Sequence, residues 1–314
     1  MPRPALSIVI PVFNSEDCLR ALASRLQEAL SPVAGAYEVL LVDDCSEDSS
    51  WIVVDELCRE VDAFRGFRFR RNFGQDNAIM AGLANASGDI VVIMDDDLQH
   101  DPEDIKLLVE NMDDNYDVCY GYFLTKKQTK IKNLGSWLNN LIANIVLRKP
   151  RILYLSPFKA IRRDIAKEVI KYQGPYPYVD GLILGVTSKV TQVALEHQFR
   201  YSGKGNYNIR ASLRVWLRVL TSFSVAPLRL ATVLGFVVSG IGFVFMAIYL
   251  VQWRLGIRGP AGWLTVTVAV LVLGGVQLMS LGLIGEYIGR IFMSQNQTMQ
   301  YIVDREVGLR QIDK

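Results

Sequence analysis

The sequence predicts an α/β fold, in which a parallel, doubly wound sheet is followed by two long apolar helices. Over the first 120 residues, short apolar runs alternate with amphipathic stretches, which is the pattern of strand–helix–strand units. A polar segment follows most of these apolar runs, and parallel sheets bind ligands beyond the carboxyl ends of their strands. Near the C-terminus, two almost uncharged runs are long enough to span a membrane.

Five apolar or β-branched runs are expected to form the strands. They are Leu6 to Val12, Glu38 to Val42, Phe67 to Arg70, Ile90 to Met94 and Asp117 to Tyr120. Helices are expected between most of them, for example at Asp17 to Leu30 and at Pro102 to Asn115. The first strand carries Pro11 near its end and no G-x-G-x-x-G run follows it, so the sequence lacks the dinucleotide-binding fingerprint.

Composition sets the broad class of protein. The chain has 314 residues, of which 50% are hydrophobic and 21% charged, and this suits one large domain together with an apolar one. Its net charge of +2 gives no reason to expect a nucleic-acid partner. The four cysteines form no C-x-x-C pair and the N-terminus lacks a secretory signal. The main domain is therefore expected in the cytosol, with reduced thiols.

Three consecutive aspartates end the fourth apolar run, in the stretch VVIMDDDLQHDP at residues 91–102. Carboxylates crowded at the end of a buried strand repel one another unless a cation or several donors compensate them. Asp95, Asp96 and Asp97 therefore favour a site for a hard divalent ion. The alternative is a solvated turn before a helix that Asp101 caps and Pro102 begins, which explains Asp101 but not the three aspartates.

The C-terminal third changes character at Pro227. The run from Leu228 to Trp253 carries one charge, Arg229, and a second run extends from Trp263 to Ile284. Such runs predict two transmembrane helices, with a buried helical hairpin as the alternative. Arginines are more frequent before the first run and after the second than between them, so both termini are expected to be cytoplasmic. The predicted segments are a catalytic domain at 1–226, a transmembrane pair at 227–290 and a cytoplasmic tail at 291–314.

Two stretches of the first domain, at about 128–149 and 206–224, place apolar residues at helical spacing beside lysines and arginines. Basic amphipathic helices with a boundary tryptophan, such as Trp216, commonly lie in the headgroup plane of a membrane. The sequence therefore predicts two interfacial helices, and ordinary amphipathic core helices are the alternative.

The succession IVIPVFNSE, LLVDDCSEDSS, RNFGQDNAIMAGL and IMDDDLQHDP resembles family 2 inverting glycosyltransferases, which have the Rossmann-like nucleotide-sugar fold called GT-A. The stretches SFSVAPLRLATVLG and GGVQLMSLGLIGEYIGRIF are similar to those of bacterial polyprenyl-phosphate glycosyltransferases. These enzymes are relatives of dolichyl-phosphate mannose synthase that carry two C-terminal membrane helices. The resemblance covers roughly residues 5 to 303, and the combination of motifs is more specific than any one of them.

The resemblance implies roles for the polar segments after the strands. Asp95 and Asp97 match the D-x-D pair through which Mg²⁺ or Mn²⁺ holds the diphosphate of a nucleotide sugar, here expected to be a UDP-sugar. The residues expected to bind the donor are Pro11, Phe13, Asn14, Glu16, Asp44, Asn72, Gly74, Asp95, Asp96 and Gln99. Several of these positions also suit turns or helix caps, an alternative that is compatible with binding.

The segment FRYSGKGNY is similar to the family run that closes over the site and contacts the lipid phosphate. The resemblance implies that Arg200, Lys204 and Tyr207 bind the acceptor phosphate. A phosphate monoester is largely dianionic at neutral pH and can attack the anomeric carbon without a strong general base. Unspecific contact with lipid headgroups is the alternative for these three residues.

The chain departs from the family in two places. YGYFLTKK replaces the arginines that often follow the fifth strand, and Pro157 stands where relatives carry the acidic residue of an Asp-Phe-Arg stretch. Asp180, in PYVDGLI, is the carboxylate expected to face the sugar as a catalytic residue instead, with a simple turn as the alternative. These differences favour an unusual sugar or a shifted acceptor site.

The sequence therefore predicts an enzyme that transfers one sugar, with inversion, to undecaprenyl phosphate or a similar lipid at the cytoplasmic face of the bacterial inner membrane. The product is expected to serve cell-envelope glycan or lipid modification, and family analogy implies a homo-oligomer, a tetramer. A processive polysaccharide synthase is the first alternative, but the sequence lacks its Q-x-x-R-W motif and its additional membrane helices. A non-catalytic, membrane-anchored nucleotide-binding scaffold is the second.

Overall fold

The computed structural model describes residues 4–31, 37–123, 153–195, 226–255, 262–295 and 299–308. Within it the chain forms two compact units. The first unit comprises Met1–Tyr207 and Gln297–Lys314, and the second comprises Asn208–Asn296.

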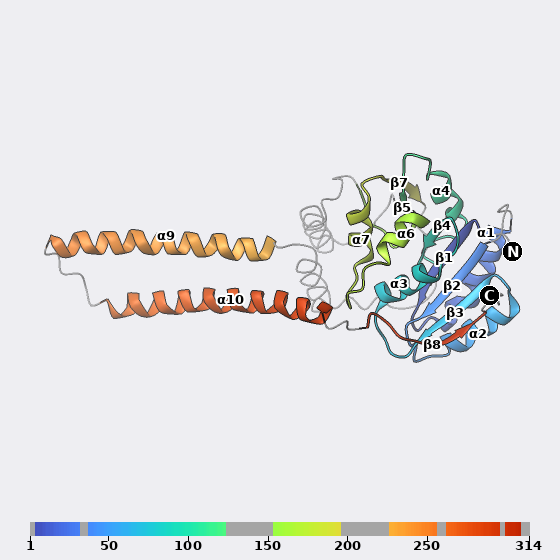
Figure 1. Cartoon of the computed structure of the whole chain (residues 1–314), viewed down its shortest axis with the longest axis horizontal. Coiled ribbons are helices and arrows are strands. Elements are labelled where there is room, and N and C mark those ends of the chain that lie inside the picture. The colour runs from blue at the N-terminus through green and yellow to red at the C-terminus, as the bar shows by residue number, and fades with distance from the viewer. Residues whose placement is uncertain are drawn as a thin grey trace. The chain divides into compact units, whose positions relative to one another are not determined.

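An eight-stranded sheet forms the centre of the first unit, in the order β7-β5-β6-β4-β1-β2-β3-β8 (Figure 1). The five predicted strands are present, as β1 Leu6–Val12, β2 Tyr37–Asp43, β3 Phe64–Phe69, β4 Ile90–Ile93 and β5 Val118–Phe123. Strands β4, β1, β2 and β3 run parallel to one another. The predicted α/β class is confirmed, because helices connect these parallel strands.

The five predicted strands run parallel to one another, but the sheet also contains antiparallel strands that were not predicted. Three further strands are present, β6 Lys159–Arg162, β7 Val190–Leu195 and β8 Val303–Val307. Strand β6 runs antiparallel to β4 and β5, and β8 runs antiparallel to β3. Strand β6 has only four residues, and β8 has three consecutive exposed charged residues between two valines at the edge of the sheet. Neither strand therefore has the apolar run from which the five other strands were predicted.

Strand β8 also changes the account of the C-terminal tail. The tail was expected as a segment of its own at 291–314, but residues 303–307 complete the sheet of the first unit. The first unit is thus built from two stretches of chain that enclose the second unit in the sequence.

Helices cover both faces of the sheet (Figure 1). They are α1 Glu16–Leu30, α2 Ser50–Glu60, α3 Gln75–Asn85, α4 Asp104–Glu110, α6 Arg163–Val169 and α7 Val179–Val186. Side chains alternate along β1, so that Ile8 and Ile10 belong to the apolar core with α1, α2 and α4, whereas Val9 belongs to the core with α3, α6 and α7. Because both faces are buried, the register of the parallel strands is fixed, and their carboxyl ends meet at one edge.

A buried glutamate fixes the opposite edge of the sheet. Glu38 in β2 is 5% exposed, and its Oε1 accepts hydrogen bonds from the Ser7 hydroxyl at 2.6 Å, the Ser87 amide at 2.6 Å and the Ser87 hydroxyl at 2.7 Å. Arg65 of β3 lies 3.3 Å from Oε2. Burial raises the pKa of Glu38, but the bonds from Ser7 and Ser87 and the charge of Arg65 outweigh burial and leave its pKa below the ordinary value.

Glu38→Gln is expected to lower the free energy of unfolding by about 2–3 kcal/mol at pH 7, because a buried cation and several donors lose a carboxylate. A depressed folded-state pKa stabilises the protein above the unfolded-state pKa of about 4.3 and ceases to do so as pH falls through the folded-state pKa. The difference between wild type and variant should therefore shrink in acid. Urea denaturation at pH 7 and in acid measures this difference in stability. Glu110→Gln is the control, because Glu110 forms an exposed pair with Lys106. A deficit that is equal at both pH values would contradict the assignment.

The second unit contains two long helices, α9 Ala226–Arg254 and α10 Trp263–Gln295, which contact each other (Figure 1). They contain the predicted apolar runs, although α10 continues past Ile284 to Gln295. Both expose large apolar side chains, such as Phe245 and Leu278. Among the described residues, the segment Val272–Gly289 has the length and the mean hydropathy, 1.3, of a membrane span. The predicted interfacial helices at 128–149 and 206–224 lie outside the described residues.

Candidate active site

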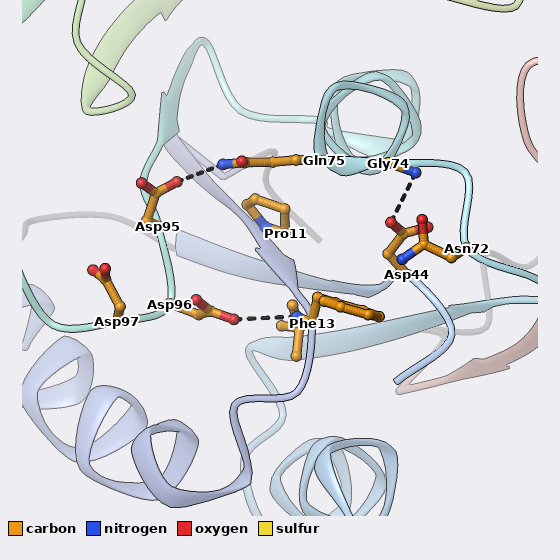
Figure 2. Close-up of a pocket in the computed structure, with 10 residues that line it drawn as sticks. Pro11, Phe13, Asp44, Asn72, Gly74, Gln75, Asp95, Asp96 and Asp97 are labelled. Carbon is orange, nitrogen blue, oxygen red and sulfur yellow. Dashed lines mark hydrogen bonds between the residues drawn. The ribbon is translucent and has the colours of Figure 1, made fainter. Parts of the chain in front are cut away.

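A cavity of about 310 Å³ opens at the edge of the sheet where the parallel strands end. Its walls come from the ends of four neighbouring strands, which lie in the order β4-β1-β2-β3 in the sheet (Figure 2). The residues that line it are Pro11, Val12, Phe13, Asp44, Asn72, Gly74, Gln75, Asp95, Asp96 and Asp97. The structure thus brings together most of the residues that the sequence analysis assigned to donor and metal binding.

Three predicted donor residues are not among the described lining residues of this cavity. Asn14 and Glu16 instead join the loop after β1 to the loop after β2. The side-chain oxygen of Asn14 accepts from the Glu47 amide at 2.8 Å, and the carboxylate of Glu16 accepts from the Ser49 amide at 2.8 Å. The backbone amide of Gln99 donates to Asp97 at 3.1 Å. These contacts place the three residues beside the cavity, where they hold its loops.

The aspartates after β4 point in different directions (Figure 2). Asp95 faces the start of α3 and accepts a hydrogen bond from the side-chain amide of Gln75 at 2.7 Å. Asp96 faces the loop after β1, where it accepts from the Phe13 amide at 3.3 Å and from the Ser15 hydroxyl. Asp96 is thus tied to the β1 loop, whereas Asp95 is held from α3.

Negative charge in this cluster exceeds what the surrounding side chains compensate. Burial, together with the charges of Asp97 and Asp96, raises the pKa of Asp95 to about 7, although Lys159 and Gln75 act in the opposite direction. Burial also raises the pKa of Asp96. A bound cation would relieve this repulsion, and a set of carboxylate oxygens suits Mg²⁺ or Mn²⁺.

The described residues alone do not complete the shell of such a cation. Within the described ranges, no three histidine, cysteine, aspartate or glutamate side chains are grouped so that they could hold a metal ion. Mg²⁺ usually takes one or two carboxylates and fills its other positions with water and substrate phosphate oxygens. The cluster therefore fits a cation that is held jointly by Asp95, Asp97 and a phosphate-bearing ligand.

Asp44 shapes the opposite wall of the cavity (Figure 2). It is 3% exposed, and its two oxygens accept from the backbone amides of Phe73 at 2.6 Å and Gly74 at 2.8 Å. Gly74 has a φ of 95°, a conformation that glycine adopts without strain. Burial raises the pKa of Asp44. Each carboxylate oxygen retains a second lone pair, so Asp44 can accept from a ligand while it holds this wall.

Asp180 is not among the described lining residues. It lies in the first turn of α7, where its carboxylate forms an ion pair with Lys159 and accepts from the Tyr120 hydroxyl at 3.1 Å. Lys159 and Gln75 were not predicted from the sequence. Lys159 was hidden because β6 was not predicted, whereas Gln75 adjoins the predicted Gly74 in RNFGQD. Arg200, Lys204 and Tyr207 lie outside the described residues.

Known proteins are similar to this chain over most of its length. Residues 7–170 match the family described as glycosyl transferase family 2, and residues 226–291 match the GtrB C-terminal hairpin family. Undecaprenyl-phosphate 4-deoxy-4-formamido-L-arabinose transferases of Yersinia pestis and Yersinia pseudotuberculosis are each 30% identical to this chain, over 99% of this chain and 96% of theirs.

The fold also has solved counterparts. A glucosyl-3-phosphoglycerate synthase from Mycobacterium tuberculosis, solved with Mn²⁺, UDP-glucose and phosphoglyceric acid, superposes with a TM-score of 0.51 at 19% identity, over 70% of this chain and 79% of that one. The family match and the full-length similarity agree with the geometry of the cavity, and the chain therefore belongs to glycosyl transferase family 2.

Proposed function

We propose that the chain transfers one sugar from a nucleotide-sugar donor to a polyprenyl phosphate, with inversion at the anomeric carbon. One observation carries this proposal: a cavity that joins Phe13 and Asp44 to the aspartates Asp95 and Asp97, in a family 2 chain. Its relatives over 99% of its length are named undecaprenyl-phosphate sugar transferases. The product serves cell-envelope glycan or lipid modification.

The nucleotide occupies the cavity at the ends of β1 and β2. The ring of Phe13 is 46% exposed and offers a flat apolar surface to a base. Asp44 holds the wall at Phe73 and Gly74 and accepts from a ribose hydroxyl or a base N–H through its remaining lone pairs. A UDP-sugar is the proposed donor, and the UDP-glucose in the fold neighbour supports this choice.

Asp95 and Asp97 hold Mg²⁺ or Mn²⁺ together with the diphosphate of the donor. When bound, the cation neutralises charge on the departing nucleotide and makes it a better leaving group. Gln75 orients the Asp95 carboxylate by donating to it. Asp96, which the loop after β1 holds, keeps that loop against the end of β4.

In the transfer step, an oxygen of the lipid phosphate forms a bond to the anomeric carbon while the bond from that carbon to the diphosphate breaks. The electron pair of the broken bond leaves with the diphosphate. Because the attacking phosphate is largely dianionic, no side chain needs to remove a proton from it. Arg200, Lys204 and Tyr207 are the residues proposed to bind this phosphate.

Helices α9 and α10 are proposed to cross the bacterial inner membrane as a pair, with the first unit and both termini on the cytoplasmic side. The match to a C-terminal hairpin family, the exposed apolar side chains and the distribution of arginines support this topology. The homo-oligomer, a tetramer by family analogy, stays a prediction that light scattering of the detergent-solubilised chain can check.

A transfer assay tests the proposed function. Membranes that contain the chain are supplied with undecaprenyl phosphate and a panel of radiolabelled nucleotide sugars, and the label that enters organic solvent is counted. Transfer to the phosphate and not to the free prenol is the expected result. Label in a water-soluble polymer would indicate a processive synthase, and no transfer from any donor would indicate a non-catalytic scaffold.

The contacts of Asp180 lead us to propose that it positions Lys159 rather than facing the sugar, as the sequence analysis assigned it. The side chain of Lys159 is 3% exposed and that of Asp180 is 16% exposed. Their ion pair is joined by the Tyr120 hydroxyl. Strand pairing places Lys159 opposite Ile93, two residues before Asp95, so Asp180 holds a cation close to the aspartate cluster.

Asp180→Asn is expected to lower the free energy of unfolding by about 3 kcal/mol, because it leaves a buried ammonium group without an ionic partner. The double variant Asp180→Asn/Lys159→Met removes both charges and should regain most of that stability, together with part of the transfer rate. Urea denaturation and the transfer assay measure both quantities. A double variant that is stable but as inactive as Asp180→Asn would instead assign the carboxylate to the sugar.

A further inference from the structure

Residues that follow α10 pair with β3 and with the start of the segment that leads from β3 to the cavity wall. Strand β8 pairs with β3 from Gly66 to Phe69, with a shift of register between Arg68 and Phe69. The pairing continues past the strand, because the amide of Arg70 donates to the carbonyl of Ile302 at 3.0 Å. The C-terminal segment thus accompanies the chain to the point where it leaves β3 and enters the cavity wall at Asn72 and Gly74.

Three aromatic rings in contact connect the C-terminal segment to the wall of the cavity. The ring of Tyr301 is stacked on that of Phe69, with centroids 5.2 Å apart and planes 11° apart. The ring of Phe69 meets that of Phe73 edge to face, at 5.7 Å and 87°. The amide of Phe73 is one of the two that donate to Asp44. Tyr301 is therefore connected to the donor cavity through two packed rings and one hydrogen bond.

A second contact holds the other side of the same wall. The side-chain amide of Gln300 donates to the carbonyls of Tyr172 at 3.4 Å and Gly174 at 3.1 Å. The next residue, Pro175, accepts from the side-chain amide of Asn77 at 3.4 Å, and Asn77 also donates to the carbonyl of Phe73 at 2.7 Å. Both routes from the C-terminal segment end at Phe73.

We infer that Tyr301 is a positioning residue for the nucleotide donor. Its ring holds Phe69 and Phe73 in place, so that the Phe73 and Gly74 amides stay aimed at Asp44. This inference rests on the proposed donor site, and it adds a residue from the far end of the chain to that site's supporting structure. Removing the ring should loosen the wall without touching the aspartates that face the cation.

The test compares Tyr301→Ala with Tyr301→Phe in the full chain in detergent. Amide exchange of Phe73 and Gly74 should be about 10-fold faster in Tyr301→Ala, and the Kd for UDP with Mn²⁺ should rise about 3- to 10-fold, as expected for the loss of one aromatic pair. Tyr301→Phe keeps the ring and should restore both values. The KM for undecaprenyl phosphate should not change.

Asp304→Asn is the matched control. Asp304 lies on the same C-terminal segment as Tyr301, and the substitution removes its ion pair with Arg70 but leaves the three aromatic rings in contact. Equal acceleration of exchange in this control, or throughout the sheet in Tyr301→Ala, would overturn the inference, as would wild-type exchange at Phe73 and Gly74. The exchange measurement needs no catalysis. If the wild-type chain transferred no sugar, the proposed function would be refuted. The exchange rates of the Phe73 and Gly74 amides would still test whether Tyr301 holds the wall.

Discussion

Asp97→Asn is expected to reduce sugar transfer to polyprenyl phosphate by about 10²- to 10³-fold, the loss typical of removing one group that stabilises charge in a transition state. The substitution keeps an oxygen in place for the hydrogen bond from the Gln99 amide and changes mainly the charge. Without that charge, the proposed cation would be held by Asp95 and the donor alone. The diphosphate then departs with its charge incompletely neutralised.

Two measurements separate this loss from misfolding. Initial rates as a function of Mn²⁺ concentration should show a weaker metal dependence in the variant, and the electron paramagnetic resonance signal of free Mn²⁺ should report weaker binding in the presence of UDP. Asp101→Asn removes a charge from the same loop and serves as the control, since Asp101 contacts the amide of Glu103. Normal transfer by Asp97→Asn, or by wild type in excess chelator, would contradict the proposed metal role.

Arg200→Ala is expected to lower the turnover efficiency for the lipid acceptor by about 30- to 1,000-fold, as for the loss of one partner of a desolvated charge pair. The reason lies in the sequence, where Arg200 immediately precedes the glycine-rich run that resembles the family's acceptor loop. The attacking group carries close to two negative charges, and a guanidinium group can bind two of its oxygens at once.

The donor should be bound almost as in wild type, and this separates Arg200 from the residues of the cavity. Kinetics with undecaprenyl phosphate and binding of UDP with Mn²⁺ supply the two readouts. Arg210→Ala, a change of the same kind in the basic amphipathic stretch, should have a small effect. If Arg200→Ala transferred sugar normally, or if wild type glycosylated the free prenol equally well, the proposed acceptor site would be wrong.

The parts of the fold that the sequence predicted are those that local patterns determine. Leu6–Val12 is buried at every position and apolar at every position except Ser7, and β2 is nearly as regular. In contrast, β6 begins with a lysine and β8 consists largely of charged residues. These strands form because they pair with strands that are distant in the sequence. Such tertiary contacts do not require an alternating or continuous apolar pattern in the strand itself.

The candidate site divides in the same way. Motifs placed Asp95, Asp97 and Asp44 correctly after the ends of strands, since each lies within three residues of the last apolar residue of a run. Lys159 was missed, although it is buried beside the aspartate cluster, because its neighbours come from β5 and α7. The role proposed for Asp180 changed for that reason: its partner in the ion pair lies 21 residues earlier in the chain.

The pairing of β8 with β3 also determines the order in which the protein can be completed during synthesis. Strand β3 ends at Phe69, and its outer edge is covered by residues that begin at Val303. The ribosome must therefore make both apolar helices before that edge is closed. Until then an open strand edge persists, a template for pairing with other chains, and long-range pairing of this kind is slow. Synthesis of both apolar helices thus precedes the last step in folding the sheet.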